Sequence, residues 1–460
     1  MKKMIHYVSI FISLLLITFS SCQQGIQKVG KDSLVKSWYY SDSLARELSQ
    51  LDSSEVEFMD GSDLINHQPV ILPTTENIVT INDYFDWPVA TKIDSTIIVL
   101  YDRRNYHFGP KPDEETQNDI HSGIRMIISS DDGGKTWNKP VDVFEQAGHW
   151  DSTVFFGWGG GVGTYQGIAY LALNEGVYKS LDKGKTWQLI NPVNNLPGEI
   201  YPVNLVYQYK PWLVQMNDQD TTGYPKYWSP GLRITFDKTH GMTIWTSRDF
   251  KPSGRDGRTP SDYSKFLSAL YSPDFGTTWK YQEQALPEGL NVNELTPVPF
   301  DGKMAFFFRN GQGAHYYGQG YSETGWFPFN FAVTSNVGPT PVMDTPDCIY
   351  NPVTKRLEAT VTIRTSVEGD PMRLDLYSID PNELAAGSNT WNFEGVLLKY
   401  RSKWGISDGM NPVAGIVDEK VGMHRIYVWG GDCRKKSGIF ELSRSLNTPM
   451  LSKYLKESRK

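Results

Sequence analysis

Carboxylates, arginines and a histidine in this sequence have the chemistry that an active site needs. Carboxylic acids and imidazole exchange protons with a reacting group, and planar guanidinium groups bind carboxylates through two parallel hydrogen bonds. Glu294 and Arg309 stand fifteen residues apart, and Arg373 lies on a later predicted strand. The other candidates gather in one N-terminal stretch: Asp86, Asp102, Arg103, Arg104, His107 and Asp113. The alternatives are a surface ion pair for Glu294 and Arg309, a strand-edge position for Arg373, and positions in a polar loop for Asp102, His107 and Asp113.

The overall charge restricts what these residues can bind. The formal net charge is −7, and it becomes −9 when Lys2 and Lys3 are removed with a signal peptide. An acidic protein repels polyanions, so the charge argues against nucleic acid as a partner. An anionic ligand must therefore be held by locally placed arginines. No cluster of His, Cys and Asp has the spacing of a metal site, and we predict no cofactor.

The N-terminus has the pattern of a secretory signal. Met1-Lys2-Lys3 precedes an apolar run from Ile5 to Phe19 that is too short for a comfortable membrane span. Two serines come directly before Cys22, as in a relaxed lipobox. We therefore predict a signal peptide at residues 1–21 and lipidation of Cys22. The lipid would anchor the protein in a bacterial cell envelope, on the periplasmic or surface side of the outer membrane. The alternatives are an ordinary signal peptide or a short anchor that contains a cysteine.

Three segments fit the pattern Ser-x-Asp-x-Gly-x-Thr-Trp, at residues 130–137, 180–187 and 272–279. The Asp side chain is expected to accept backbone N–H bonds two or three residues on, and the Gly to supply the positive φ of a tight hairpin. The hydroxyls would tie the edges of the turn, and the Trp would wedge between adjacent sheets. Average residue usage excludes chance for three matches. We interpret them as structural clamps rather than as the place of the chemistry.

The spacing of the clamps predicts a β-propeller. Asp132 and Asp182 are 50 residues apart, and Asp182 and Asp274 are 92 apart, which we interpret as two steps with an unmarked blade between them. Weaker copies of the pattern occur at residues 322–326 and 378–391. A unit of about 50 residues with four short strands is one propeller blade.

The predicted domain organisation follows from this period. Residues 76–447 have room for an all-β, six-bladed propeller with Asp-box hairpins, and seven blades are the alternative. Residues 22–75 are predicted to hold the lipidated cysteine, a tether and an N-terminal cap, and residues 448–460 a C-terminal tail.

With these clamps the chain resembles the sialidases and their Asp-box, or BNR-repeat, relatives, over roughly residues 80–445. That family consists of six-bladed propellers that are glycoside hydrolases. In it a glutamate precedes a strand, an Asp-Gly type hairpin follows, and an arginine ends the next strand. Here Glu294, Asp301-Gly302 and Arg309 match this order.

The resemblance implies roles for these residues. Glu294 would be the base that activates a tyrosine nucleophile, because an anionic sugar repels a carboxylate nucleophile but not a phenol. Arg309 would be one of three arginines that hold the substrate carboxylate. The segment Arg373-Leu374-Asp375 resembles the strand that carries the third arginine.

The N-terminal match departs from the family pattern. Sialidases open the first blade with Arg-Ile-Pro, whereas this chain has Asp86-Trp87-Pro88, so the first arginine is absent. An Asp in its place is expected to bind sugar hydroxyls, or a neighbouring Arg103 or Arg104, rather than a carboxylate. The segment from Leu100 to His107 resembles the family's Asp-x-Arg segment, which precedes its acid/base aspartate. Asp102, His107 and Asp113 all stay candidates for that role.

The nucleophile also departs from the pattern. Where the family has Tyr-Ser after the last clamp, this chain reads Ile406-Ser407-Asp408, without a tyrosine. Tyr400 is the nearest substitute in the sequence. The resemblance therefore implies a bacterial lipoprotein member with a divergent active site.

These observations favour an exo-acting glycoside hydrolase of sialidase-like type that removes a terminal, acidic sugar from glycans. A glycan substrate is the expected partner, membrane contact is expected only through the lipid anchor, and the protein is expected to be a monomer. The aromatic rim that stacks on the sugar would be drawn from five tryptophans: Trp87, Trp150, Trp158, Trp228 and Trp404.

Two alternatives belong to other functional classes. The first is a uronate-directed polysaccharide lyase that uses His107, His149 or His315 with a tyrosine. The second is a non-catalytic propeller lipoprotein whose end face binds a glycan or a protein. Convergence of the candidate carboxylates and arginines on one end of the central channel would favour an active site. Cys348 and Cys433 are either a disulfide or two thiols.

Overall fold

Short segments with alternating buried side chains form the strands of this protein, because in a strand successive side chains point to opposite faces of the sheet. The structure is a computed structural model. It describes residues 56–59, 66–71, 84–104, 123–143, 160–173, 176–190, 228–248, 266–310, 316–337, 345–364, 371–402, 407–409, 412, 414–432 and 437–447. All of them belong to one compact unit, residues 51–460.

The strands follow one another in antiparallel runs, and we number the runs in chain order. Run 1 holds β3 (Tyr84–Ile93), β4 (Thr96–Arg104), β5 (Gly123–Ser130) and β6 (Val141–Asp142). Run 2 holds β7 (Gly161–Tyr165), β8 (Ile168–Leu173), β9 (Gly176–Ser180) and β10 (Gln188–Leu189). Run 3 holds β11 (Trp228–Asp237), β12 (Gly241–Arg248), β13 (Phe266–Ser272) and β14 (Lys280–Ala285).

The second half of the chain continues in the same way. Run 4 holds β15 (Val292–Phe300), β16 (Lys303–Asn310), β17 (Gly318–Ser322) and β18 (Asn330–Val333). Run 5 holds β19 (Asp347–Asn351), β20 (Arg356–Ile363), β21 (Met372–Ile379) and β22 (Asn392–Ser402), with the short helix α5 (Pro381–Ala385) between the last two. Run 6 holds β23 (Ser407–Gly409), β24 (Ile416–Asp418), β25 (Met423–Asp432) and β26 (Ser437–Ser445).

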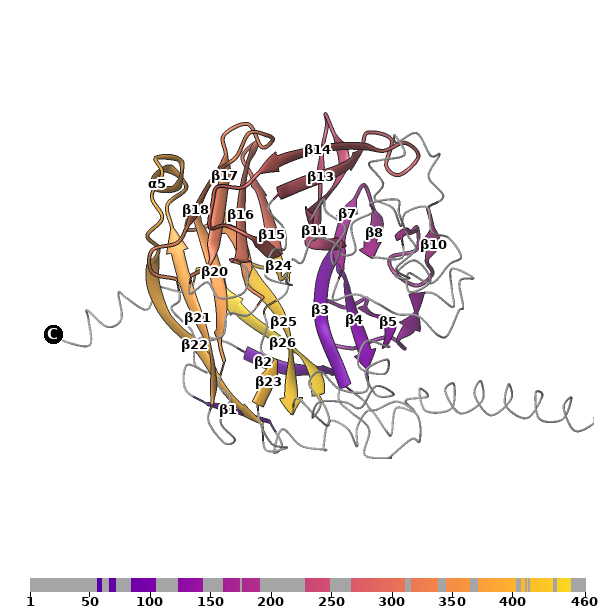
Figure 1. Cartoon of the computed structure of the whole chain (residues 1–460). Coiled ribbons are helices and arrows are strands. Elements are labelled where there is room, and N and C mark those ends of the chain that lie inside the picture. Colours follow the sequence, from indigo (N-terminus) through magenta and orange to yellow (C-terminus); the bar gives the residue numbers. More distant parts are fainter. Residues whose placement is uncertain are drawn as a thin grey trace, which may run out of the picture. The chain divides into compact units, whose positions relative to one another are not determined.

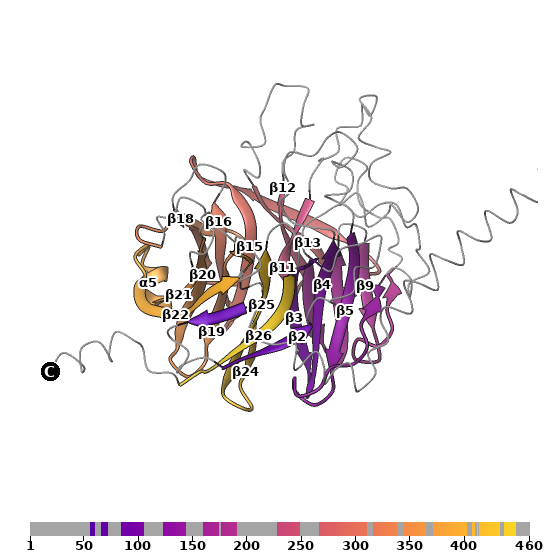
Figure 2. The same ribbon diagram turned by 90° about the horizontal axis from the view of Figure 1, so that it is seen from below.

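The runs are organised in four sheets that form a β-propeller arrangement (Figures 1 and 2). Run 4 is a four-stranded sheet, and run 5 gains β1 (Val56–Met59) to become five-stranded. Runs 2 and 3 share an eight-stranded sheet, and runs 6 and 1 share a nine-stranded sheet. The predicted all-β class is therefore confirmed, whereas the number of blades stays a prediction.

The first strands of the runs surround a common axis. β3 contacts β7, β7 contacts β11, β11 contacts β15, and β15 contacts β19. The circle closes where β24 contacts β3, and where the backbone N–H of Ala90 donates to the carbonyl of Ala414 at 3.2 Å. The runs are therefore arranged around one central axis.

Two N-terminal strands complete the last two runs. β1 (Val56–Met59) pairs with β22, and β2 (Asn66–Ile71) pairs with β26. The first two described strands thus lie on the last two runs, and β2 lies along β26 (Figure 2). No helix in the described residues is both long and apolar enough to span a membrane.

Hydrophobic cores fill the spaces between neighbouring runs. In the core between runs 3 and 4, the buried Trp245 ring lies 5.0 Å from Phe306 and 5.6 Å from Phe329. In the core between runs 4 and 5, the Phe307 ring lies 5.0 Å from Trp391. These clusters hold the sheets face to face, as the propeller requires.

The three Ser-x-Asp-x-Gly-x-Thr-Trp turns share one hydrogen-bond pattern, shown here for residues 180–187. Asp182 Oδ1 accepts the Thr186 backbone N–H at 2.8 Å, and Oδ2 accepts the Thr186 hydroxyl at 2.6 Å. The Ser180 hydroxyl donates to Asp182 and accepts the Gly184 N–H, and Gly184 has a φ of +90°. In the equivalent turn at residues 130–137, hydrogen bonds from the Thr136 backbone and hydroxyl lower the pKa of Asp132 to about 2. The acceptor Asp therefore closes each turn in its ionised form.

Each turn also packs on the run before it. A Cβ on Gly184 would lie 3.1 Å from Ile98 of run 1, and one on Gly276 would lie 2.6 Å from Ile190 at the end of run 2. The turns at 180–187 and 272–279 therefore belong to consecutive runs, and β7 and β11 pair directly. The interpretation of an unmarked blade between Asp182 and Asp274 was wrong. The additional residues, 191–227 and 249–265, lie outside the described part of the chain.

Candidate active site

The predicted site residues lie near one end of their strands. Asp86 is third in β3 and Glu294 third in β15, Arg309 is next to last in β16, and Arg373 is second in β21. Since neighbouring strands are antiparallel, all four lie where the first strand of each run begins. We call this end of the propeller the site end, and the opposite end, which carries the repeat turns, the turn end.

Backbone irregularities concentrate at the site end. Register shifts occur at residues 86–89 in β3, 230–234 in β11 and 292–295 in β15, all near the beginning of a first strand. Trp87, within the first shift, has a φ of +52°, which is rare for a bulky residue. Bulges redirect side chains and are frequent next to functional sites.

Three charged side chains form a row across run 1. Asp86 lies opposite Asp102 in the β3–β4 register, and Asp102 lies opposite Arg125 in the β4–β5 register. All three are buried, and Arg125 forms an ion pair with Asp102 through Nη1 and Oδ1. Asp102 therefore positions a buried guanidinium. Arg125 was missed in the sequence because only the register places it beside two aspartates.

The neighbours of this row have different environments. Arg103 is buried and lies opposite Phe85 in register, so its side chain emerges on the other face of the sheet from Asp102. For Arg104, at the end of β4, only the backbone position is described. Trp87 is buried and stacks on Trp429 at 5.6 Å. The prediction that Trp87 belongs to an exposed aromatic rim was therefore wrong, because its ring packs in the protein interior.

Glu294 and Arg309 form an ion pair, the contact that the sequence offered as the alternative to their catalytic roles. Arg309 Nη1 lies 3.2 Å from Glu294 Oε2 and 3.4 Å from Oε1. Glu294 lies within the register shift of β15 and is not paired in the regular ladder. The Glu294 side chain is 11% exposed, and the Arg309 side chain is 28% exposed. A carboxylate and a guanidinium that are partly shielded and partly accessible at the site end are suited to contact a polar ligand.

Arg373 is held by a buried carboxylate. Its Nε and Nη2 donate to the two oxygens of Asp375 at 2.7 and 2.8 Å, and 43% of the Arg373 side chain stays exposed. Burial raises the pKa of Asp375, and Arg373 opposes that shift. Burial, together with the charge of Asp375, raises the pKa of Tyr377 to about 12. The bidentate pair fixes the plane of the guanidinium and leaves its other N–H groups available for a ligand.

A polar network connects the first strands of runs 3 and 5 near the central axis. Arg233 of β11 donates to Asp347 at 2.6 Å and to the carbonyls of Cys348 and Gly415 at 2.7 and 3.0 Å. Asp347 also accepts the Gly415 N–H at 2.9 Å. These contacts tie the first strands of runs 3 and 5 to the segment that enters β24. The hydroxyl of Thr296, two residues after Glu294, donates to the carbonyl of Pro346 at 3.2 Å. Thr296 lies two residues, or roughly 7 Å, along β15 from Glu294. The network is therefore closer to the turn end than Glu294 is.

The network continues through a buried histidine. His424 Nε2 lies 3.8 Å from Asp347, and Arg444 Nε lies 3.2 Å from His424 Nδ1. Arg444 in turn forms an ion pair with the buried Glu358. Burial lowers the pKa of His424 to about 4, and the cation of Arg444 acts in the same direction. His424 is therefore neutral at pH 7 and accepts the Arg444 hydrogen bond. None of these residues was a sequence candidate, since each partner comes from a distant run.

Other candidates have different outcomes. Tyr400 is fully buried, and its hydroxyl donates to the Gly431 carbonyl at 3.3 Å, so it does not face a substrate. Cys348 is a buried free thiol. The described residues contain no cluster of His, Cys, Asp and Glu that could hold a metal ion. The following candidates lie outside the described residues: Cys22, His107, Asp113, His149, Trp150, Trp158, His315, Trp404 and Cys433. For Trp228 only the backbone is described.

Comparison with known proteins gives similarity at the level of structure. No protein-family model matches the sequence, and neither does any curated protein. The chain is similar to Trypanosoma rangeli sialidase, with 14% identity and a TM-score of 0.50 over 88% of this chain and 61% of that one. It is also similar to a protein of unknown function from Dyadobacter fermentans DSM 18053, with 14% identity and a TM-score of 0.49 over 82% and 99%.

The intramolecular trans-sialidase from Ruminococcus gnavus is a further neighbour, with 13% identity and a TM-score of 0.43 over 81% of this chain and 97% of that one. The likeness to the Trypanosoma rangeli sialidase, with its TM-score of 0.50, supports a distant sialidase-like fold. This chain spans about three-fifths of the Trypanosoma rangeli sialidase, 61% of that chain. At this level of identity the likeness is one of fold alone.

Proposed function

We propose that the protein is an exo-acting glycoside hydrolase of sialidase-like type that removes a terminal, acidic sugar from glycans. The contact between Glu294 and Arg309, 3.2 Å apart beside a bulge at the site end, is the observation that carries the proposal. The fold adds support, since its neighbours include sialidases. A base next to a cation at the site end suits a substrate whose anionic group must be held while a neighbouring bond reacts.

The proposed roles follow from the contacts. Glu294 acts as the general base, and its ion pair with Arg309 orients it. Arg309 binds the substrate carboxylate, and Arg373 does so with the N–H groups that Asp375 leaves unoccupied. Asp86, which stands where sialidases have their first arginine, is fully buried, so we assign it no contact with the sugar. We assign no nucleophile, because Tyr400 is buried.

The finer architecture belongs to the same proposal. We propose six blades, one for each run, because the eight- and nine-stranded sheets are each held together by a single parallel pair between two antiparallel runs. Those pairs are Arg233 with Val162 and Ser437 with Tyr84. We further propose that Cys22 is lipidated and holds the protein in a bacterial cell envelope. Metabolic labelling with an alkyne fatty acid tests the anchor, and the label should disappear in Cys22→Ala.

Glu294→Gln tests the catalytic proposal. The full-length protein is assayed against sialyl, ulosonyl and uronyl glycosides, and the variant on the substrate that is cleaved. We expect kcat to fall by about 10²- to 10⁴-fold, since the amide removes the base but keeps the shape. Glu288→Gln, an exposed glutamate in the turn before β15, is the matched control and should have wild-type activity.

The kinetics of Arg309→Lys separate binding from chemistry. A lysine keeps the charge but loses the bidentate geometry, so KM should rise more than kcat falls. Unchanged kcat in Glu294→Gln would remove Glu294 from the mechanism. Unsaturated products from uronyl substrates would identify a lyase instead, and glycan binding without turnover of any substrate would identify a binding protein.

A further inference from the structure

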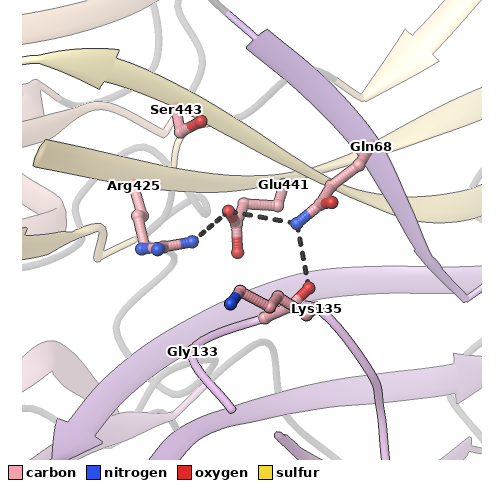
Figure 3. Close-up of a pocket in the computed structure, with 7 residues that line it drawn as sticks. Gln68, Gly133, Lys135, Arg425, Glu441 and Ser443 are labelled. Atoms are coloured by element: carbon pink, nitrogen blue, oxygen red, sulfur yellow. Dashed lines mark hydrogen bonds and ion pairs between the residues drawn. The ribbon is translucent and has the colours of Figure 1, made fainter. Parts of the chain in front are cut away.

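A cavity of about 220 Å³ lies where the N-terminal strand meets the first and last runs (Figure 3). Its lining comes from β2, from the turn after β5, and from β25 and β26: Gln68, Gly133, Gly134, Lys135, Arg425, Glu441 and Ser443. The turn follows the last residue of β5, so the cavity lies at the turn end of run 1. It is therefore separate from the proposed active site and independent of it.

The one carboxylate in the lining is already bound by protein donors. Glu441 is buried, and its Oε1 forms an ion pair with Arg425. Its Oε2 accepts a hydrogen bond from the Tyr427 hydroxyl at 2.6 Å. Gln68 Nε2 lies 3.3 Å from Oε1 and donates to the Gly134 carbonyl at 3.0 Å. Figure 3 shows Arg425 and Gln68 on either side of Glu441. Glu441 thus positions its neighbours, and its oxygens are occupied.

The rest of the lining is cationic and rich in hydrogen-bond donors. Arg425 and Lys135 contribute two positive charges against the single negative charge of Glu441. Among the described residues, Nε of Arg425 is a buried donor without a hydrogen-bond partner. Lys135 is exposed, and Ser443 adds a hydroxyl. A concave site with excess positive charge and N–H and O–H donors is suited to an oxyanion.

We propose that this cavity binds a small oxyanion, namely a phosphate, sulfate or carboxylate group, free or carried by a monosaccharide. The bound anion accepts hydrogen bonds from Arg425, Lys135 and Ser443. Lys135 belongs to run 1, whereas Arg425 and Ser443 belong to run 6. The anion therefore bridges the seam where the ring closes and stabilises the folded protein by mass action.

Calorimetric titration of the full-length protein with inorganic phosphate, sulfate and glucuronate tests this proposal. We expect saturable binding of at least one anion, and the tightest of the three identifies the preferred group. The midpoint of thermal unfolding should rise on the order of 3 °C at 100 times the dissociation constant. Lys135→Ala and Ser443→Ala should each weaken the binding, the lysine variant by about tenfold.

Two controls make the result specific. Lys185→Ala changes the equivalent lysine of the second repeat turn, which does not line the cavity, and should bind the anion like the wild type. Arg309→Gln removes a cation at the site end, so anion binding that survives in this variant does not come from the proposed active site. Absence of saturable binding of all three anions, or equal affinity in Lys135→Ala and the wild type, would overturn the proposal.

Discussion

The buried side chain of His424 should make the stability of the protein fall in mild acid. The pKa of His424 drops from its ordinary 6.5 to about 4, chiefly because the ring is buried. Between these two pH values the unfolded chain binds a proton that the folded protein does not. His424 therefore does not lower the free energy of unfolding above pH 6.5, but it lowers it progressively as the pH falls from 6.5 towards 4. At 1.36 kcal/mol per pKa unit, the loss is about 3 kcal/mol.

The charges around His424 agree with this sign. The cation of Arg444 opposes protonation of His424, whereas Asp347 and Glu358 favour it less strongly than burial opposes it. Burial alone would raise the pKa of Asp347, but Arg233, His424 and the Gly415 N–H together lower it. Asp347 therefore stays ionised between pH 6.5 and 4, and its own contribution is lost only at lower pH.

Replacement of His424 by glutamine isolates this contribution. The amide can accept the Arg444 hydrogen bond but does not titrate, so the variant should lose about 2 kcal/mol less than the wild type between pH 7 and pH 4.5. Urea titrations followed by tryptophan fluorescence at several pH values measure this difference. A lower free energy of unfolding of the variant at pH 7 does not affect the comparison, because only the change with pH is compared.

His240→Gln is the matched control for this experiment. His240 lies on a turn beside Asp237, 3.1 Å from its carboxylate, and its replacement should leave the acid-side loss in place. Parallel curves for His424→Gln and the wild type would refute the reasoning, because they would show that His424 does not become charged on unfolding.

Three further predictions concern the fold, and urea unfolding at pH 7 measures each. Asp182→Ala removes the acceptor of the Thr186 hydrogen bonds and should cost about 1–2 kcal/mol, so an unchanged stability would contradict the clamp interpretation. Trp245→Ala empties the core between runs 3 and 4 and should cost about 3–5 kcal/mol, and a loss below 1 kcal/mol would show that this core is not closely packed. Gly415→Ala places a methyl group 2.9 Å from Asp347 and should cost about 1–3 kcal/mol, which a neutral result would disprove.

The local chemistry of the turns could be predicted from the sequence. The spacing of Ser, Asp, Gly and Thr within eight residues specifies which side chain accepts which N–H, and the turn at 180–187 has these bonds. The weaker copy near residue 378 was a poorer guide, because Asp380 caps the helix α5 by accepting the Asn382 N–H at 2.8 Å. The same residue type closes a turn in one context and begins a helix in another.

The candidate site could be predicted only in part. The fifteen-residue step from Glu294 to Arg309 spans a single hairpin, so the contact follows from local register. The partner of Asp102 did not follow, because Arg125 arrives from a strand beyond residues 105–122 and carries no motif. The burial of Trp87 was also invisible in the sequence, since its partner Trp429 belongs to the last run.

The sequence by itself determined the all-β class, the turn chemistry and the Glu294–Arg309 pair, because each depends on residues that are close in the chain. Only the tertiary structure decided which runs are neighbours, where the first strands bulge, and which buried charges meet near the central axis. Arg233 and Asp347 are 114 residues apart, and Gln68 and Glu441 are 373 apart. Contacts at such separations follow from the closure of the ring, and no local pattern of residues encodes them.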